Sequence, residues 1–292
     1  MSISAVILSF NAKEDLQRCV RSLVEVEKLR AGEDQILIVD NGSTDGSRTL
    51  IERLAGTYPD LIDTILLDRN RGTTAPRNLG FAKAKGDYVL VIDSDIQFRS
   101  PVLSPLTEQL AADPSIGIIA PRLIFPDGRR QMSTDVFPTI PRKLERLFRL
   151  RRLERLGDGR RQPSHVVDYA ISAFWLMRRG LIDRIGPLDE RIFYAPEDVD
   201  FCLRTWLGGK SVVYRQDLDV VHDAQERSRS LKGLLFSWRH ILGLAYFFRK
   251  HRYAFNRHAL YRRIGKPRAR QVEGTLLAAS KLARELESGV RG

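Results

Sequence analysis

Apolar segments and helix-like segments alternate along the first 92 residues of the chain. Each apolar segment is short and dominated by Val, Ile and Leu, which is typical of a strand buried on both faces. Strands that alternate with helices form a parallel sheet covered by helices on both sides, so we predict an α/β fold with a mostly parallel central sheet. The predicted strands are Ser4–Ser9, Gln35–Val39, Thr64–Leu67 and Asp87–Ile92, and the helical segments between them are Lys13–Leu29, Ser47–Leu54 and a third that ends near Lys85.

Polar residues follow each predicted strand at the point where the chain should leave the sheet. In open parallel sheets, ligands bind outside the carboxyl ends of the strands. Four such clusters at one edge therefore predict a polar ligand there. The clusters are Ser9-Phe10-Asn11, Asp40-Asn41-Gly42-Ser43, Asn70-Arg71-Gly72 and Asp93-Ser94-Asp95.

The last of these clusters carries the most specific chemistry. Asp93 and Asp95 stand two residues apart at the end of an extended segment, so their carboxylates face the same side. Two converging carboxylates suit a hard cation whose remaining positions go to phosphate oxygens and water, as in the binding of a nucleotide diphosphate. The same pattern is also an ordinary turn signal, and this reading stays open here.

Composition limits the class of protein. The 292 residues, 43% of them hydrophobic, are enough for one core and a smaller appended layer. Cys19 and Cys202 lie far apart, which favours neither a disulfide framework nor a zinc site and suits a reducing cytoplasm. The first residues do not resemble a signal peptide, and the longest apolar stretch, Ile241–Phe248, is too short to span a bilayer. The net charge of +12 predicts an anionic partner.

Five motifs together resemble the family 2 glycosyltransferases with a GT-A fold. In chain order they are VILSFN, VDNGSTDGS, NRGTTAPRNLG, DYVLVIDSD and FYAPEDVDFCLR, spread over roughly residues 3–222. The bacterial branch that includes rhamnosyltransferases and other cell-surface polysaccharide enzymes is the most similar. The resemblance implies a catalytic domain at 1–224, with a nucleotide-binding half at 1–100 and an acceptor-binding half at 101–224. A basic insertion would occupy 129–163, and a basic amphipathic helical region would follow at 225–292.

The resemblance also assigns residues to a nucleotide-sugar donor and a metal. The donor would be a dTDP-, UDP- or GDP-linked sugar, and the cation, Mg²⁺ or Mn²⁺, would be held by Asp95, Asp93 and His222. The cation would neutralise the diphosphate as it leaves. The residues expected around the nucleotide are Ser9, Phe10, Asn11, Asp40, Asn41, Asn70, Gly72, Arg77, Asn78, Asp93 and Ser94.

The acidic pair Glu197-Asp198 is the candidate catalytic centre. Inverting glycosyl transfer needs a carboxylate that takes the proton from the acceptor hydroxyl. By resemblance this base is Asp198, with Glu197 as a neighbour that binds acceptor or sugar hydroxyls. The alternative to a catalytic role is a structural one, because proline and acidic residues are favoured in the first turn of a helix and would stabilise the helix that begins after Pro196.

A sugar or acceptor pocket is expected from Ser172, Ala173, Trp175 and Arg204. Relatives often carry Gly where Ser172-Ala173 stand, so a pocket of different shape is expected and rhamnose is only one candidate sugar. Trp175 could stack on a sugar face or belong to the core. Arg204 also stands at i,i+4 from Asp200, the spacing of an intrahelical ion pair.

Basic amphipathic stretches suggest contact with a membrane. Residues 142–161 contain nine Lys or Arg against three acids, and leucines recur at near-helical spacing over Lys143–Leu156. A second stretch, Leu231–Tyr253, mixes apolar and basic residues. Either could lie on anionic lipid at the inner face of the cytoplasmic membrane and approach a lipid-linked acceptor, or pack on the protein core.

The resemblance thus implies a metal-dependent, inverting glycosyltransferase for cell-surface polysaccharide, glycolipid or lipid-linked glycan. Three alternatives remain open. A sugar nucleotidyltransferase would carry a Gly-rich basic loop after the first strand, where this chain has Ser9-Phe10-Asn11-Ala12. A nucleic-acid-binding protein would use the positive charge, but the acidic cluster at the sheet edge argues against it. A catalytically inactive nucleotide-sugar-binding protein would share the whole site.

Overall fold

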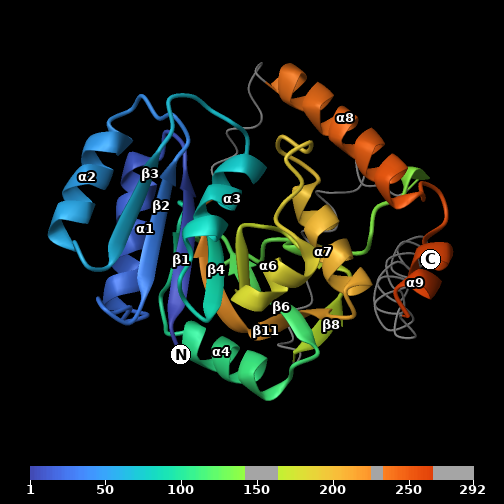
Figure 1. Ribbon diagram of the computed structural model, residues 1–292, viewed down its shortest axis with the longest axis horizontal. Helices are drawn as coiled ribbons and strands as arrows, with labels where there is room; N and C mark the ends of the chain where they lie inside the picture. The colour runs from blue at the N-terminus through green and yellow to red at the C-terminus, as the bar shows by residue number, and fades with distance from the viewer. Residues whose placement is uncertain (142–163, 225–232, 266–292) are drawn as a thin grey trace, which may run out of the picture.

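The computed structural model describes residues 1–141, 164–224 and 233–265, and within them nine strands form one central sheet (Figure 1). The strand order is β3-β2-β1-β4-β10-β6-β11-β5, and β8 pairs with β11 beside this path. The strands are β1 (Ile3–Ser9), β2 (Gln35–Asp40), β3 (Ile62–Leu66), β4 (Tyr88–Asp93), β5 (Ile96–Gln97), β6 (Ile116–Ile124), β8 (His165–Val167), β10 (Phe174–Arg178) and β11 (Ser211–His222).

The first four strands pair in parallel, as the sequence predicts. β1 lies between β2 and β4, and β3 lies outside β2. The predicted α/β fold is therefore confirmed, with small shifts of the element bounds. The first helix ends at Glu25 rather than Leu29, since Lys28 adopts a left-handed backbone that a helix cannot continue. The helices of this half are α1 (Lys13–Glu25), α2 (Ser47–Thr57) and α3 (Thr74–Lys83).

The second half of the sheet is mixed, because β5 and β8 also run antiparallel to their neighbour β11. β10 runs antiparallel to both β4 and β6, and β11 runs parallel to β6. The carboxyl end of β11 consequently reaches the same edge of the sheet as that of β4. A small second sheet pairs β7 (Thr134–Asp135) with β9 (Tyr169–Ala170). The helices of this half are α4 (Leu103–Ala112), α6 (Arg179–Ile185) and α7 (Glu197–Leu207).

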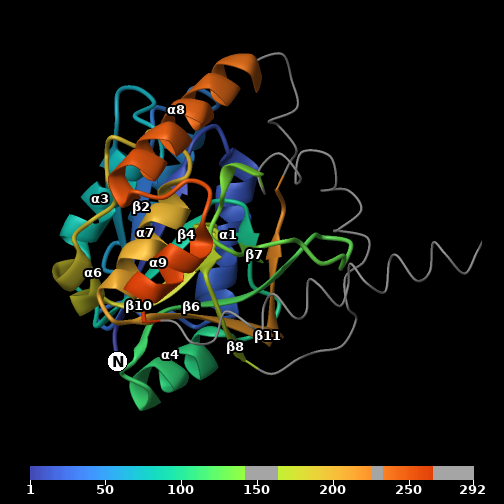
Figure 2. The same cartoon turned by 90° about the vertical axis from the view of Figure 1, so that its right-hand side faces the viewer.

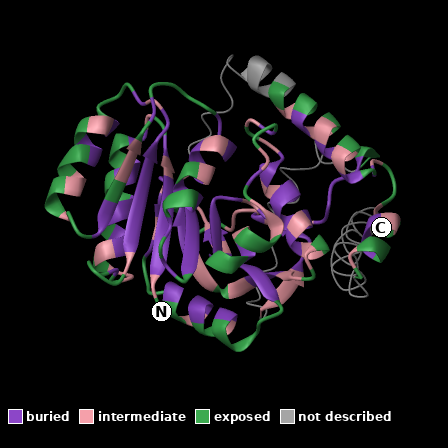
Figure 3. Cartoon of the chain, viewed as in Figure 1, coloured by how far each residue is buried: buried purple, intermediate pink, exposed green. Residues whose placement is uncertain are grey.

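Helices cover both faces of the sheet, so that the strands are buried almost throughout (Figure 3). One core layer lies between the sheet and α1, α2 and α4, to which Leu16, Leu50 and Leu106 contribute. The other lies beneath α3, α6 and α7 and includes Phe81 and Phe201. This burial on both faces explains why the strands read as continuous apolar runs.

The described part of the C-terminal region packs on the second of these layers. It contains α8 (Gly233–His251) and α9 (Arg257–Arg263), and their residues Phe247, Leu260 and Tyr261 are buried in the same cluster as Phe201. Figure 2 shows α8 extending over the end of the molecule where α3 and α7 begin. No described helix has the length and hydropathy that crossing a membrane requires. The predicted amphipathic segment Lys143–Leu156 falls within 142–163, outside the described residues.

Candidate active site

Strand register brings the predicted polar clusters together at one edge. Ser9 pairs with Asp40 in the β1–β2 ladder, and Leu8 pairs with Asp93 in the β1–β4 ladder. Asp40 and Ser9 are fully buried, while Asp93 is half-buried at the end of β4. The carboxyl ends of three neighbouring strands therefore supply one continuous polar surface.

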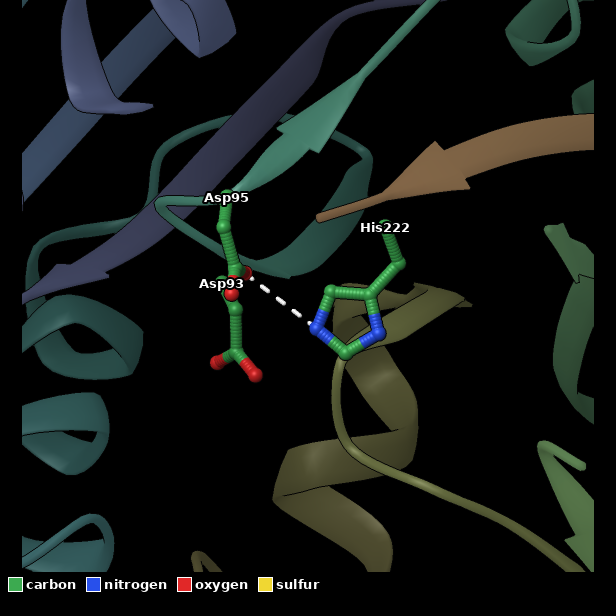
Figure 4. A group of neighbouring side chains, drawn as sticks. All are labelled: Asp93, Asp95 and His222. Carbon is green, nitrogen blue, oxygen red and sulfur yellow. Dashed lines mark ion pairs between the residues drawn. The ribbon is translucent and has the colours of Figure 1, made fainter. Parts of the chain in front are cut away.

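His222 reaches this surface from far along the chain. It is the last residue of β11, whose end pairs with the short strand β5 that begins directly after Asp95. The amide of Asp223 donates to the Asp95 carbonyl at 3.0 Å, which fixes the alignment. His222 Nε2 consequently lies 3.2 Å from Asp95 Oδ1, as Figure 4 shows. One donor atom from each of Asp93, Asp95 and His222 falls within 4.8 Å of the others.

The ring of His222 is oriented by Gln131. Nδ1 lies 2.7 Å from Gln131 Oε1, which fixes the ring so that Nε2 faces the carboxylates. Burial lowers the pKa of His222, but the adjacent carboxylate of Asp95 raises it more, and the net direction is upward. Burial also raises the pKa of Asp93, and the neighbouring Asp95 adds to this rise although the Arg77 guanidinium opposes it. The cluster therefore attracts positive charge.

These three residues fit a divalent cation. Two carboxylate oxygens and one imidazole nitrogen are ligands that Mn²⁺ accepts, and carboxylates with water also suit Mg²⁺. The second ring nitrogen of His222 is already held by an amide oxygen, which is the usual outer support of a metal-binding histidine. The donor set and its orientation thus agree with the cation that the sequence predicts.

A second group of predicted residues forms the loops beside the cation cluster. The side chain of Asn41 donates to the carbonyl of Gly72 at 2.7 Å and to Asn70 Oδ1 at 3.3 Å, and it accepts from the amide of Arg71 at 2.8 Å. The side chain of Asn11 accepts from the amide of Thr44 at 2.8 Å. Asn41 thus ties the turn after β2 to the loop that precedes α3.

Gly72 makes the closest backbone approach in this region. Its φ is +81°, and a Cβ built there would lie 2.0 Å from the carbonyl oxygen of Phe193. The amide of Thr73 donates to the same carbonyl at 2.8 Å. The loop before α3 therefore lies directly against the segment that leads to Glu197, and only glycine fits the contact.

Arg77 joins the cation cluster to the acidic pair. Its guanidinium is 2% exposed, with Nη2 at 2.6 Å from Asp93 Oδ1 and Nη1 at 3.2 Å from Glu197 Oε1. Ser172 Oγ accepts from Nη1 at 2.9 Å and donates to Glu197 at 3.0 Å. The four residues thereby form one largely buried network, although they come from α3, β4, the β9–β10 connection and α7.

The two acids of the predicted catalytic pair have different surroundings. Glu197 is buried, and burial and the neighbouring Asp198 raise its pKa to about 7 although Arg77 opposes the rise. Asp198 is only half-buried in the first turn of α7. The side chain that a solvent-borne hydroxyl can approach is therefore that of Asp198.

Unsatisfied polar atoms gather at the same edge. Six buried side-chain polar atoms lack a hydrogen-bond partner among the described residues, and four of these six belong to predicted site residues. Buried polar groups in native proteins are normally paired, so such a cluster indicates a polar ligand. The four atoms are Ser9 Oγ, Asp40 Oδ1, Arg77 Nε and Asp95 Oδ1, the last of which makes the ion pair with His222.

Two of the predicted pocket residues lie elsewhere. Trp175 is 0% exposed, stacks on Phe201 with ring centroids 5.4 Å apart, and donates to the Ala170 carbonyl at 3.0 Å. It is therefore a core residue and does not face a sugar pocket. Arg204 binds Asp200 at 2.9 Å and the carbonyls of the α6–α7 turn, so it holds α7 in place and does not line the site.

The remaining predicted residues are distributed as follows. The side chain of Asn78 donates to the Leu188 carbonyl at 2.9 Å and accepts from the Leu188 amide at 2.9 Å. Ala173 is buried and contributes its carbonyl to the amide of Asp93 at 3.2 Å. Ser94 is buried within the turn, whereas Phe10 is exposed beside the β1 end. Ser172 alone of the predicted pocket residues lies inside the network around Glu197.

Sequence reasoning missed Gln131. It lies in the segment predicted to be a basic insertion, and neither its spacing nor its neighbours signal a site residue. The structure brings it to His222 because its amide binds the Leu123 carbonyl at 2.9 Å, near the end of β6. A lone glutamine in a loop gives no pattern that could have identified this contact.

The fold matches that of solved GT-A proteins. S. aureus TarS 1–349 in complex with UDP-GlcNAc superposes with a TM-score of 0.58 at 18% identity, over 79% of this chain and 61% of that chain. A mannosyltransferase from Pyrobaculum calidifontis in complex with GDP-Man and Mn²⁺ superposes with a TM-score of 0.55 at 16% identity, over 77% of this chain and 57% of that chain. The architecture is that of the GT-A class.

The family model described as glycosyl transferase family 2 matches residues 4–186, so the chain belongs to this family. A pre-mycofactocin glycosyltransferase of Mycobacterium tuberculosis is 27% identical over 78% of this chain and 44% of the relative. A prophage bactoprenol glucosyl transferase homolog of Escherichia coli is 26% identical over 72% of this chain and 61% of the relative. An undecaprenyl-phosphate 4-deoxy-4-formamido-L-arabinose transferase of Pseudomonas fluorescens is 34% identical over 37% of this chain and 32% of the relative. The chain thus spans between about a third and three fifths of these relatives' lengths.

Proposed function

We propose that this protein is a divalent-cation-dependent, inverting glycosyltransferase that moves a sugar from a nucleotide diphosphate to a hydroxyl acceptor. The observation that carries the proposal is the arrangement around Arg77, which connects the cation cluster at Asp93 to the acidic start of α7. A leaving diphosphate and an attacking hydroxyl need these two features side by side. Membership of family 2 supports the same activity.

Asp198 is the proposed general base. In this reaction the acceptor oxygen bonds to the anomeric carbon as the bond from that carbon to the diphosphate oxygen breaks, and the bonding electrons leave with the diphosphate. Asp198 takes the proton of the acceptor hydroxyl. It is the more accessible acid of the pair, while Glu197 is held by Arg77 and Ser172. The role of Glu197 is then to fix the first turn of α7.

The nucleotide diphosphate would lie along the ends of β1, β2 and β4. Ser9 and Asp40 offer unsatisfied polar atoms toward the nucleoside, and Asp93, Asp95 and His222 would hold the cation. The cation, when bound, neutralises the charge that develops on the diphosphate. Without one, two carboxylates would repel the phosphates. The mannosyltransferase was solved with Mn²⁺ beside its GDP-Man, which supports this requirement.

The donor is proposed to be a UDP-, GDP- or dTDP-linked sugar. TarS was solved with UDP-GlcNAc and the mannosyltransferase with GDP-Man. These structures support a nucleotide-sugar donor but do not identify its nucleotide base. A rhamnosyl donor remains a prediction. For the acceptor, we propose a lipid-linked substrate at the inner face of the cytoplasmic membrane, because relatives are named for undecaprenyl-phosphate and bactoprenol.

The alternative functions fit the site less well. A sugar nucleotidyltransferase would need basic groups in the turn after β1, where the structure has Phe10, Asn11 and Ala12. A nucleic-acid surface would not place Asp93, Asp95 and Asp40 at the ligand-binding edge. A binding protein without catalysis shares the geometry, and an activity measurement separates it from the proposal.

The test is the variant Asp198→Asn. It keeps the shape and the hydrogen bonds of a helix start, so we expect donor affinity to be nearly unchanged and transfer to fall by roughly a hundredfold or more. Turnover at saturating donor and donor affinity should be measured for both proteins. Asp183→Asn, in α6, is the control for loss of one acid. Near-wild-type transfer by Asp198→Asn would contradict the assignment of the base.

A further inference from the structure

The outer face of α8 exposes large apolar side chains beside the candidate active site. Ile241 is 50% exposed and Leu242 is 65% exposed, although both lie in the middle of a helix. The opposite face of the helix, through Gly243, Phe247 and His251, is buried. An exposed pair of this kind on a helix that already has a buried face indicates a partner for the second face.

The charge of this part of the chain points to the nature of that partner. Residues 233–265 contain seven Lys or Arg and no Asp or Glu. Arg249 lies about two turns beyond Leu242 on the exposed side of α8, and Arg252 is exposed directly after the helix. Phe255, in the turn before α9, is also largely exposed. Aliphatic and aromatic side chains together with arginines, free of acids, are typical of a helix that lies on anionic lipid.

Contacts hold α8 at a defined position relative to the acidic pair. Gly243 packs so closely on the segment before α7 that a Cβ there would lie 2.2 Å from the Ala195 carbonyl oxygen. The guanidinium of Arg239 lies 4.1 Å from the centre of the Phe193 ring. Both contacts fall within four residues of Glu197. A surface that seats on α8 is therefore placed next to the start of α7.

Buried ion pairs strengthen this attachment. Lys250 Nζ lies 2.7 Å from Asp189 Oδ2 and 2.7 Å from Asp200 Oδ1, and His251 Nε2 lies 2.7 Å from the same Asp200 oxygen. Asp200 belongs to α7, the helix that begins with Glu197. These ion pairs fix the C-terminal end of α8 to α7 and to Asp189. Figure 1 shows α8 at the upper right of the molecule.

We propose that the outer face of α8, defined by Ile241, Leu242 and Arg249, is a docking surface for an anionic bilayer. This inference rests on the proposed function, since the bilayer would present a lipid-linked acceptor to the half-buried Asp198. Docking itself does not depend on catalysis. Ile241 and Leu242 enter the boundary between headgroups and acyl chains, and Arg249 contacts the anionic headgroups.

The experiment is co-sedimentation of the full chain with vesicles of phosphatidylcholine alone and of phosphatidylcholine mixed with phosphatidylglycerol. We expect binding to the mixed vesicles that weakens between ~0.05 M and ~0.5 M salt, as surface potentials are screened. Ile241→Ser/Leu242→Ser should lower the partition coefficient by roughly tenfold or more, because two apolar side chains lose their burial. Leu207→Ser, at the far end of α7 and 42% exposed, is the matched control for Leu242→Ser and should bind as the wild type does.

Two results would overturn the proposal. One is equal vesicle binding by the wild type and the Ile241→Ser/Leu242→Ser variant. The other is a wild-type dimer, seen by analytical ultracentrifugation without vesicles, that this variant converts to a monomer while vesicle binding persists; the face would then contact a second copy. Donor hydrolysis in the absence of vesicles is measured in parallel. If hydrolysis and nucleotide binding in the presence of Mn²⁺ are both absent in all proteins while docking behaves as expected, the proposed function fails and the docking surface stands.

Discussion

Arg77 Nη1 lies 3.2 Å from Glu197 Oε1, and the two residues are separated by 120 positions in the sequence. The same guanidinium binds Asp93 at 2.6 Å, so one buried cation neutralises two acids from different elements. Charges taken out of water need such pairing, because an unpaired buried charge costs several kcal/mol, on the order of 3 or more. The relationship makes Arg77 the structural link between the cation cluster and the start of α7.

Replacement of this link should destabilise the protein. Arg77→Met leaves the buried carboxyl of Glu197 and the half-buried carboxyl of Asp93 without their partner, and we expect the free energy of unfolding to fall by about 3 kcal/mol. Denaturant titration measures the change. Arg77→Met/Glu197→Gln should regain part of the loss, since one of the two unpaired charges is gone. If both variants unfold at the wild-type midpoint, Arg77 does not stabilise the network.

The cation cluster should control nucleotide binding. Asp95→Ala removes one of the three candidate cation ligands, so we expect the affinity for UDP, GDP or dTDP in the presence of Mn²⁺ to fall at least tenfold. Calorimetry measures this affinity. Asp127→Ala removes an exposed acid paired with Arg129 and serves as the control. Tight nucleotide binding by the wild type in the presence of a chelator would rule out the cation bridge.

The contact between Gly72 and Phe193 should tolerate no side chain. Gly72→Ala adds a Cβ at 2.0 Å from the Phe193 carbonyl and strains a backbone at φ +81°, and we expect a loss of roughly 2–4 kcal/mol from both effects together. Gly32→Ala is a close control, because Gly32 has φ +79° but no atom within 4 Å of such a Cβ. Thermal or chemical unfolding of both variants separates strain from collision. Equal losses would mean that the collision is relieved by movement of the 193 segment.

The buried cluster around Asp200 should make stability depend on acidic pH. Burial raises the pKa of Asp200, but His251, Arg204 and Lys250 lower it more, and the net pKa lies below the ordinary value of 3.8. A carboxyl with a depressed pKa in the folded state stabilises the fold above its unfolded pKa and loses this contribution as pH falls through the folded pKa. The Asp200 contribution should therefore be complete above about pH 5 and decline below about pH 4.

Asp200→Asn isolates this contribution. We expect the variant to lose about 3 kcal/mol at neutral pH, because Lys250 and Arg204 keep their charges in a buried setting. The difference in unfolding free energy between wild type and variant should shrink as pH is lowered from about 5 to 3. Urea titrations across this range measure it. A difference that stays constant with pH would show that Asp200 is not ionised in the folded protein.

The sequence alone determined the local features of this protein. Apolar runs such as Gln35–Val39 indicated buried parallel strands, because their periodicity needs no knowledge of distant contacts. The positions of Asp93 and Asp95 at the end of β4 followed in the same way, since a strand end is a local property. The i,i+4 pair of Asp200 and Arg204 is likewise confirmed.

Tertiary structure decided what meets at the site. Gln131 and His222 are 91 residues apart and come together because β6 and β11 run in parallel to the same edge. Trp175 belongs to the core because the antiparallel strand β10 points its ring at Phe201, a direction that composition does not encode. Long-range contacts depend on strand order and direction, and one sequence without its fold fixes neither. For this reason the chain alone predicted which residue types form the site, while the fold determined their partners.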